Sequence, residues 1–395
     1  MQRTLTTEKL PIRLWLPDID ADTLQQAKNL ANLPCIFHHV AIMPDAHVGY
    51  GMPIGGVAAA VEVVIPNAVG VDIGCGVAAC RTSLAGLDGA SLKRLLGEVR
   101  RHIPLGFQHH KQPQPHSRMP EIDAGEGSGE LAVVEAEYES GRLQLGTLGG
   151  GNHFIEVQGG DDGFLWLMIH SGSRNLGYRV ANHYNRIAAQ ATGRHKLFPL
   201  SWQLDYLKVD SGEGRSYLRE MEYCVRFAAA NRRAMMDRVQ ELLADLQPGV
   251  EFTAFYDVAH NYAAVEEHFG RRVVVHRRGR RGRRRAISAS SPAPRAATAT
   301  WCAALAMPRA SPPVPMGRGG GWGENRPSGN STCARRSPAS RSGAFSTPSA
   351  TARISRRPPG PIRISTRSWP TSRIWCASSP PSTPWRWSRA EGRRR

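Results

Sequence analysis

The hexapeptide Val71-Asp72-Ile73-Gly74-Cys75-Gly76 places a carboxylate and a thiol three residues apart in a run of small residues. Glycine allows sharp turns that other residues resist, so backbone and ligands can approach closely here. Soft sulfur beside hard oxygen suits a borderline divalent ion, which makes Asp72 and Cys75 a candidate metal site. Taken alone, the hexapeptide favours a simpler interpretation, because an isolated cysteine usually packs as a small buried hydrophobe.

The charge of the chain is concentrated in one segment. The sequence has 395 residues, a length typical of about two domains or one large α/β unit, and a net charge of +18. From Arg277 to the end there are 25 Arg and two Glu, with neither Lys nor Asp, whereas the first 276 residues hold 26 basic and 31 acidic side chains. All 14 histidines lie at or before His276. We therefore expect the chemistry in the mildly acidic first part.

The cysteines indicate a reducing compartment. Seven of them are scattered singly, without a CxxC pair, which is not the pattern of a disulfide framework. No stretch approaches the roughly 20 apolar residues of a membrane span, and the N-terminal residues MQRTLTTEKLPIRLW contain no apolar run of the signal-peptide type. The sequence predicts a cytoplasmic protein with no membrane partner.

Apolar periodicity predicts both strands and helices. Asp20 is the expected N-cap of the first helix, and Tyr256 is expected to open a helix that runs through Glu267. The other expected helices cover residues 21–30, 91–102, 178–191 and 216–246, and the expected strands cover 36–43, 57–65, 164–169 and 272–276. The predicted fold class is α/β (α+β).

Further polar side chains stand beside glycines or at the end of a predicted strand. Three consecutive glycines precede Asn152 and His153, and Glu156 follows. The strand over residues 164–169 ends in a polar cluster that opens with His170, and strand ends are where α/β sheets usually place ligands. A lone histidine is more often a satisfied core residue. Imidazole together with amide and carboxylate groups instead suits a metal ion beside a nucleotide.

Six segments, in this order, resemble one family, the RtcB-type RNA-splicing ligases. They are PDAHVGYGMPIGG, VGVDIGCG, GTLGGGNHFIEV, MIHSGSRNLG, AHN and VVVHR, and the resemblance covers about residues 1–278. The motifs are long, which makes the resemblance specific. It implies a ligase core, incomplete here, with packed β-sheets around a central metal and GTP cleft flanked by helices.

The resemblance also implies cofactors and their ligands. It implies two Mn²⁺ ions and GTP, with Cys75 as the thiolate that bridges both ions. Asp72 and His153 would complete one metal site, and His170 and His260 the other. The residues that would hold GTP are Asn152, Glu156 and Asn261.

The implied reaction joins an RNA 3′-phosphate or 2′,3′-cyclic phosphate end to a 5′-hydroxyl end, as in tRNA splicing and RNA repair. A histidine of the family attacks the α-phosphate of GTP and becomes guanylylated; the guanylyl group passes to the RNA 3′-phosphate, and the 5′-hydroxyl displaces it. The implied partner is RNA with such broken ends, for which tRNA is one candidate. An activating protein partner is compatible with this reaction.

The sequence departs from the family in its last third. The nucleophilic histidine should lie in a C-terminal motif His-Gly-Ala-Gly-Arg, but no histidine follows His276. Residues 279–395 are rich in Arg, Ser and Pro. One interpretation is a tail without structure that binds the RNA backbone. The other is a shifted reading frame.

The genetic code supports the shifted frame. GC-rich codons read across Pro313 to Gly320 in another frame encode Cys-Pro-His-Gly-Ala-Gly-Arg, and three further stretches match the family's missing C-terminus in order. A stop codon can straddle Ala390 and Glu391. We hypothesise a one-base deletion between about codon 278 and codon 283. The written chain would then keep its metal ligands but lack the guanylylated histidine and be inactive as a ligase.

Two other functions compete with this one. The first, from a different class, is a non-catalytic metal- and RNA-binding protein with a genuine basic tail. The second is a metallohydrolase that uses the same ligands, which is weaker because nothing in the sequence singles out hydrolysis.

Overall fold

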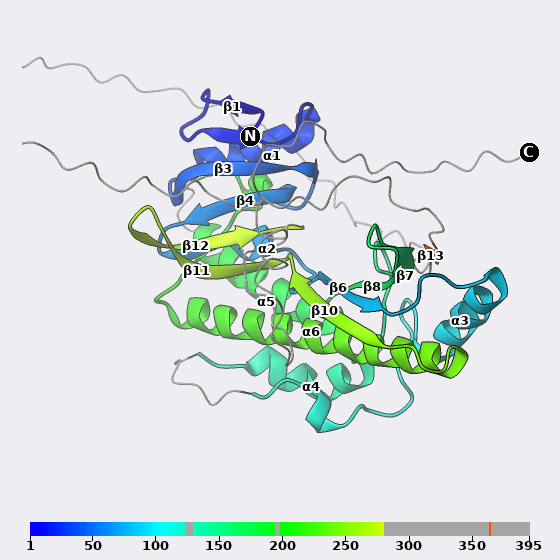
Figure 1. Cartoon of the computed structure of the whole chain (residues 1–395). Coiled ribbons are helices and arrows are strands. Elements are labelled where there is room, and N and C mark those ends of the chain that lie inside the picture. Colours follow the sequence, from blue (N-terminus) through cyan, green and yellow to red (C-terminus); the bar gives the residue numbers. More distant parts are fainter. Residues whose placement is uncertain (123–128, 194–197, 280–362, 365–395) are drawn as a thin grey trace, which may run out of the picture. The chain divides into compact units, whose positions relative to one another are not determined.

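The computed structural model describes residues 1–122, 129–193, 198–279 and 363–364, and all of these belong to one unit of the chain. The largest sheet has the strand order β1-β2-β3-β4-β12-β11 (Figure 1). Its neighbours pair antiparallel except β2 and β3. The strands are β1 (Arg3–Leu5), β2 (Ile12–Leu14), β3 (Ile36–His47), β4 (Ile54–Ala60), β11 (Tyr262–His268) and β12 (Arg271–Arg277).

A second sheet has the order β10-β6-β8-β7-β13. Its strands are β6 (Gly76–Thr82), β7 (Phe154–Gly159), β8 (Leu165–Ser171), β10 (Phe252–Ala259) and β13 (Arg363–Ile364). A short ribbon pairs β5 (Val63–Val64) with β9 (Leu207–Lys208). The mixed α/β class predicted from the sequence is confirmed.

Three of the helices in the described ranges, α1, α3 and α6, begin at a side-chain cap. Asp20 accepts a hydrogen bond from the Thr23 N–H at 2.8 Å, as predicted, and Asp88 caps the third helix in the same way. None of the helices in the described ranges is long and apolar enough to cross a membrane. The helices are α1 (Ala21–Asn32), α2 (Pro66–Val69), α3 (Gly89–His102), α4 (Ala132–Gln144), α5 (Arg174–Gly193) and α6 (Gly212–Leu246), with 3₁₀ turns η1 (His116–Arg118) and η2 (Leu200–Trp202).

Helix α6 connects the two large sheets. It contacts β6, β8 and β10 of the five-stranded sheet and β11 of the six-stranded one, and it runs beside α5 (Figure 1). Its apolar positions match the predicted amphipathic pattern: Met235 and Val239 are fully buried against β6 and β8. The packing of α6 against strands of both sheets therefore fixes the positions of the strand ends in each sheet.

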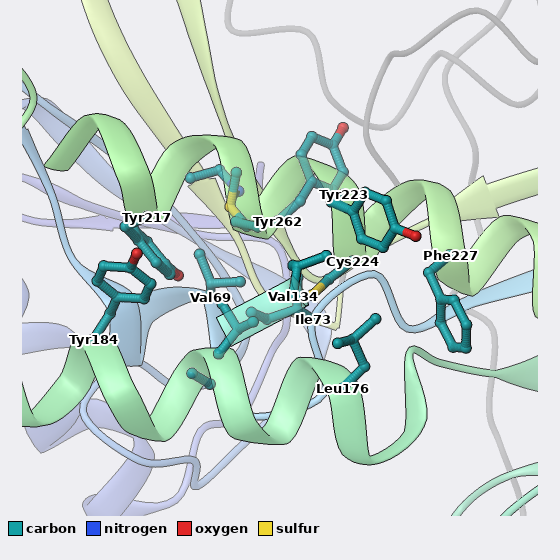
Figure 2. Close-up of a cluster of buried hydrophobic side chains, with 14 of the residues drawn as sticks. Val69, Ile73, Val134, Leu176, Tyr184, Tyr217, Tyr223, Cys224, Phe227 and Tyr262 are labelled. Carbon is teal, nitrogen blue, oxygen red and sulfur yellow. Dashed lines mark hydrogen bonds between the residues drawn. The ribbon is translucent and has the colours of Figure 1, made fainter. Parts of the chain in front are cut away.

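An aromatic core fills the space between α5 and α6. Figure 2 shows Tyr184 and Leu176 of α5 facing Tyr217 and Phe227 of α6, and all four side chains are buried. The Tyr184 and Tyr217 rings lie 5.1 Å apart at a tilt of 50°. Packing two rings in this way adds about 0.5–1.5 kcal/mol to the burial of their area, so the two helices are held rigidly against each other.

The helix predicted from Tyr256 through Glu267 is wrong. These residues belong to β10 and β11, with the sharp turn at His260 and Asn261 between them. Strand β10 pairs antiparallel with β6 over nearly its whole length. Pairing with a buried strand outweighs local helical preference, because strand formation depends on the neighbours that a residue meets in the tertiary structure.

Two other boundaries differ from the prediction. The strand expected over residues 57–65 is divided into β4 and β5 by a turn at Glu62, whose φ is 59°. Strand β3 runs on through His47, beyond the expected end of the strand at residue 43. In the tail, β13 pairs in parallel with β7, with Arg363 opposite Glu156. The sequence predicted no structure there, and the rest of residues 280–395 lies outside the described residues.

The buried histidine His276 makes the stability of the fold depend on pH. Its Nε2 accepts a hydrogen bond from the Ile65 N–H at 2.9 Å. Burial lowers the pKa of His276 to about 4, below the 6.5 expected for the unfolded chain. The unfolded chain therefore binds the extra proton below pH 6.5, and the stability that the neutral ring provides is lost as pH falls from about 6.5 to about 4.

We predict that His276→Gln, which keeps an acceptor, weakens this pH dependence. Between pH 7 and pH 4 the free energy of unfolding should fall by about 3 kcal/mol less than in the wild type. Urea unfolding followed by circular dichroism measures the difference, and His109→Gln, at an exposed loop position, is the control. Identical pH dependence in the wild type and His276→Gln would contradict the assignment.

Candidate metal centre

The loop that carries Asp72 and Cys75 is pressed against α6. Gly74 has a φ of 73°, and a Cβ at this position would lie 2.8 Å from Val225 Cα, so only glycine fits. The Gly74 N–H donates to Asn261 O at 2.7 Å, and the Cys75 N–H donates to Asp72 O at 3.2 Å. This tight turn presents the carboxylate and the thiol to the same side.

Two imidazole rings are oriented by backbone carbonyls. His153 Nδ1 donates to Leu148 O at 2.9 Å, and His170 Nδ1 donates to Asn152 O at 3.0 Å. A carbonyl oxygen can only accept, so the hydrogen must be on Nδ1 in both rings. Both Nε2 atoms are thereby aimed at Cys75, which is the arrangement that metal-binding histidines adopt.

The five residues predicted as metal ligands come together in two groups that share Cys75. His153 Nε2 lies 2.9 Å from Asp72 Oδ2 and 3.5 Å from Cys75 Sγ. His170 Nε2 lies 3.3 Å from Cys75 Sγ and 3.2 Å from His260 Nε2. Within each group the ligand atoms all lie within 4.8 Å of one another. Thiolate, imidazole and carboxylate suit a borderline divalent ion, so this cluster could hold a metal.

Burial and neighbouring charges set the ionisation of the cluster. Burial, and next the charge of Asp72, raise the pKa of the Cys75 thiol well above its usual value. Burial opposes the ionisation of Asp72, but the neighbouring imidazole of His153 outweighs it and holds the pKa of that carboxyl below its usual value. Burial, reinforced by His153, lowers the pKa of His170 to about 4. A bound cation would therefore displace the thiol proton, while the imidazole of His170 is already neutral.

The residues predicted to hold GTP lie around this cluster. Asn152 is exposed, and its carbonyl orients His170. Glu156 lies on β7, two residues beyond Phe154, and Phe154 pairs with His170. The side chains of Glu156 and His170 therefore project from the same face of the sheet. The Asn261 amide instead bridges two backbone groups: it donates to Asp72 O at 3.0 Å and accepts from the Gly279 N–H at 2.6 Å.

Several functional candidates were missed by the sequence analysis. Arg174 stands at the start of α5 with a φ of 58° and donates to Thr147 Oγ1 at 3.3 Å. Burial lowers the pKa of its guanidinium, and the charges of Asp72 and Cys75 oppose that shift. The others are Asn231, Arg232 and Asp257. Of these four residues, only Arg174 was indicated by the sequence, because it is the last residue of the polar cluster that begins with His170. Asn231 and Arg232 are hidden among the charges of an amphipathic helix.

The chain is similar in sequence to known RNA ligases. The family described as tRNA-splicing ligase RtcB matches residues 26–296. The chain is 34% identical to the RNA-splicing ligase RtcB of Escherichia coli K12 over 301 residues, which cover 70% of this chain and 72% of that protein. It is 35% identical to the tRNA-splicing ligase RtcB of Thermococcus kodakarensis over 309 residues, which cover 65% of this chain and 64% of that protein.

We predict that Cys75→Ser abolishes divalent-cation binding at the cluster, because both groups lose the same ligand. Affinity for Co²⁺, measured by equilibrium dialysis, should fall by more than the about 10–100-fold that loss of an outer-shell partner costs. Cys80→Ser is the matched control, since the buried thiol of Cys80 on β6 contacts Gln240 and lies outside the cluster. Unchanged binding by Cys75→Ser would show that the cluster is not the cation site.

Proposed function

The chain belongs to the RtcB tRNA-splicing ligase family, and we propose that residues 1–278 form the metal- and GTP-binding part of an RNA ligase site. The convergence of two ligand groups on Cys75 carries this proposal. We propose that they hold two Mn²⁺ ions, one with Asp72 and His153, the other with His170 and His260. Bound there, the ions would supply positive charge that neutralises and orients phosphate oxygens.

The remaining side chains would bind and orient the nucleotide. Glu156 offers a carboxylate on the same sheet face as His170, and its oxygens can accept hydrogen bonds from a guanine or a ribose hydroxyl. Exposed Asn152 offers an amide beside the cluster. We propose that these two residues contact GTP directly. Asn261 acts on the nucleotide through the loop of Asp72, which it holds in place.

The proposed substrates are RNA ends that carry a 3′-phosphate, or a 2′,3′-cyclic phosphate opened to it, and a 5′-hydroxyl. In this chemistry a histidine nitrogen attacks the α-phosphate of GTP and pyrophosphate leaves. The guanylyl group moves to the RNA 3′-phosphate, and attack by the 5′-hydroxyl then releases GMP. tRNA is the substrate that the names of the relatives suggest.

A protein with the sequence as it stands would not carry out the first of these steps. No histidine follows His276, so the histidine that accepts the guanylyl group is missing from the sequence. The family match ends at residue 296 and leaves residues 297–395 unmatched. The match ends beyond codons 278 to 283, and what supports a frame shift before residue 297 is that residues 297–395 have no family match. The alternative function is a non-catalytic metal- and RNA-binding protein, which the 25 arginines from Arg277 onward favour.

Covalent labelling with α-³²P GTP and Mn²⁺ distinguishes ligase chemistry from binding alone. A version with the reading frame restored should form a labelled protein, and replacing the histidine of its His-Gly-Ala-Gly-Arg motif by alanine should abolish the label. The written chain should bind GTP without becoming labelled, because it lacks the nucleophile. Covalent label on the written chain would reveal another nucleophile and refute this account.

The frame shift has a direct test of its own. Sequencing the gene across codons 278 to 283 should reveal one missing base relative to a frame that encodes the family's C-terminal motif. The restored frame should end at the stop codon that straddles the codons of Ala390 and Glu391. Sequencing reads and a purified protein mass that both agree with the written frame would favour the basic-tail alternative.

A further inference from the structure

Two adjacent residues of α6 contact the segments that carry the metal-ligand candidates. The Asn231 amide nitrogen donates to Thr147 O at 3.1 Å and to Gly172 O at 3.1 Å, and its oxygen accepts from the Gly146 N–H at 2.7 Å. These backbone groups belong to the loop before His153 and to the turn after β8. Asn231 is fully buried, so these bonds are shielded from water.

The neighbouring Arg232 makes a more selective set of contacts. Its guanidinium is buried and donates through Nη1 to Gly74 O at 2.8 Å and to Ser171 O at 3.0 Å. Its Nε donates to Asp257 Oδ1 at 2.7 Å. One planar group thus joins three segments that lie far apart in the sequence.

Two of these contacts are with residues adjacent to a candidate ligand, and the third is with a residue of the strand that leads to another ligand of the same group. Gly74 directly precedes Cys75, and Ser171 directly follows His170. Asp257 lies on β10, three residues before His260. Arg232 therefore contacts the backbone next to Cys75 and next to His170, together with a side chain three residues before His260, and none of these three contacts is with the segment of His153.

We propose that Arg232, held by Asp257, is a positioning residue for the metal group of Cys75, His170 and His260. The inference rests on the proposed metal function of that cluster. Ligand atoms must be held within about half an ångström of a productive geometry, and they are held by the groups that support them. Here the support is the guanidinium fork, which fixes the backbone beside the thiol and the imidazole.

Only arginine meets these requirements at this position. Its guanidinium presents donors in a rigid plane, so Nε and Nη1 can serve the carboxylate and the two carbonyls at once. A lysine ammonium keeps the charge for Asp257 but is a single point that cannot span the same acceptors. Arg232→Lys therefore preserves the ion pair and removes the fork, which separates positioning from charge.

The experiment is a Co²⁺ titration of the full chain, followed by visible absorbance. Co²⁺ bound to a thiolate and imidazoles gives a charge-transfer band from sulfur and d–d bands that report its geometry. We expect Arg232→Lys to bind the ion of this group about 10–100-fold more weakly, with shifted bands. Arg233→Lys is the matched control, since Arg233 is the next residue of α6 and pairs with Asp237 at the surface; its titration should match the wild type.

Three outcomes would overturn the proposal. Arg232→Lys that loses thermal stability but keeps the wild-type affinity and spectrum would show that the residue only supports the fold. If Arg232→Lys does not fold by circular dichroism, Asp257→Asn decides the question, and a wild-type affinity and spectrum in that variant would refute positioning. Failure of the wild type itself to bind Co²⁺ would instead refute the proposed metal function, and this inference with it.

Discussion

The buried ion pair of Arg232 and Asp257 is the interaction on which the arrangement of the centre depends. A guanidinium that is 1% exposed has lost its water, and it is tolerable only because a carboxylate and two carbonyls satisfy it. Those acceptors come from the Asp72 loop, from the end of β8 and from β10. The cost of burying the charge therefore forces three distant segments to meet at one point of α6. Any shift of one segment would leave a charged donor unpaired in the interior.

The same helix explains why the centre is rigid. Helix α6 packs through Met235 and Val239 on the five-stranded sheet and through Tyr217 and Phe227 on α5. Its position is therefore determined by two hydrophobic cores, and its polar residues cannot move independently of them. The imidazoles of His153 and His170 are held from the other side by carbonyls, which keep both Nε2 atoms aimed at Cys75. The fold thus holds the candidate ligand atoms of each group within 4.8 Å of one another.

Under the proposed function, binding and catalysis depend on different parts of the sequence. The cluster around Cys75 and the face that carries Glu156 come from residues that the family match covers. The nucleophile of the proposed reaction would belong to a His-Gly-Ala-Gly-Arg motif, and no histidine follows His276 in this sequence. On that proposal the chain would retain its metal ligands and lose the covalent chemistry, because the ligands and the nucleophile come from different parts of the sequence. Restoring one reading frame would bring both parts into a single protein.

Local sequence patterns were sufficient to predict the features that depend on residues close together in the sequence. Asp20 and the apolar spacing of α6 predicted helices correctly, since caps and amphipathic faces act within a few residues. Asp72, Cys75 and the three histidines were predicted as metal ligands from short motifs, and the structure brings them together in two groups that share Cys75. The helix predicted from Tyr256 through Glu267 failed, since β10 exists only by pairing with β6, whose sequence lies far upstream.

The role of Arg232 was equally invisible in the sequence, because its acceptors lie 158 and 61 residues away. The sequence by itself determined which groups could bind a cation. Only the tertiary structure decided that they share Cys75 and are held by α6, because a buried polar group takes its partners from whatever segments the packed core brings beside it.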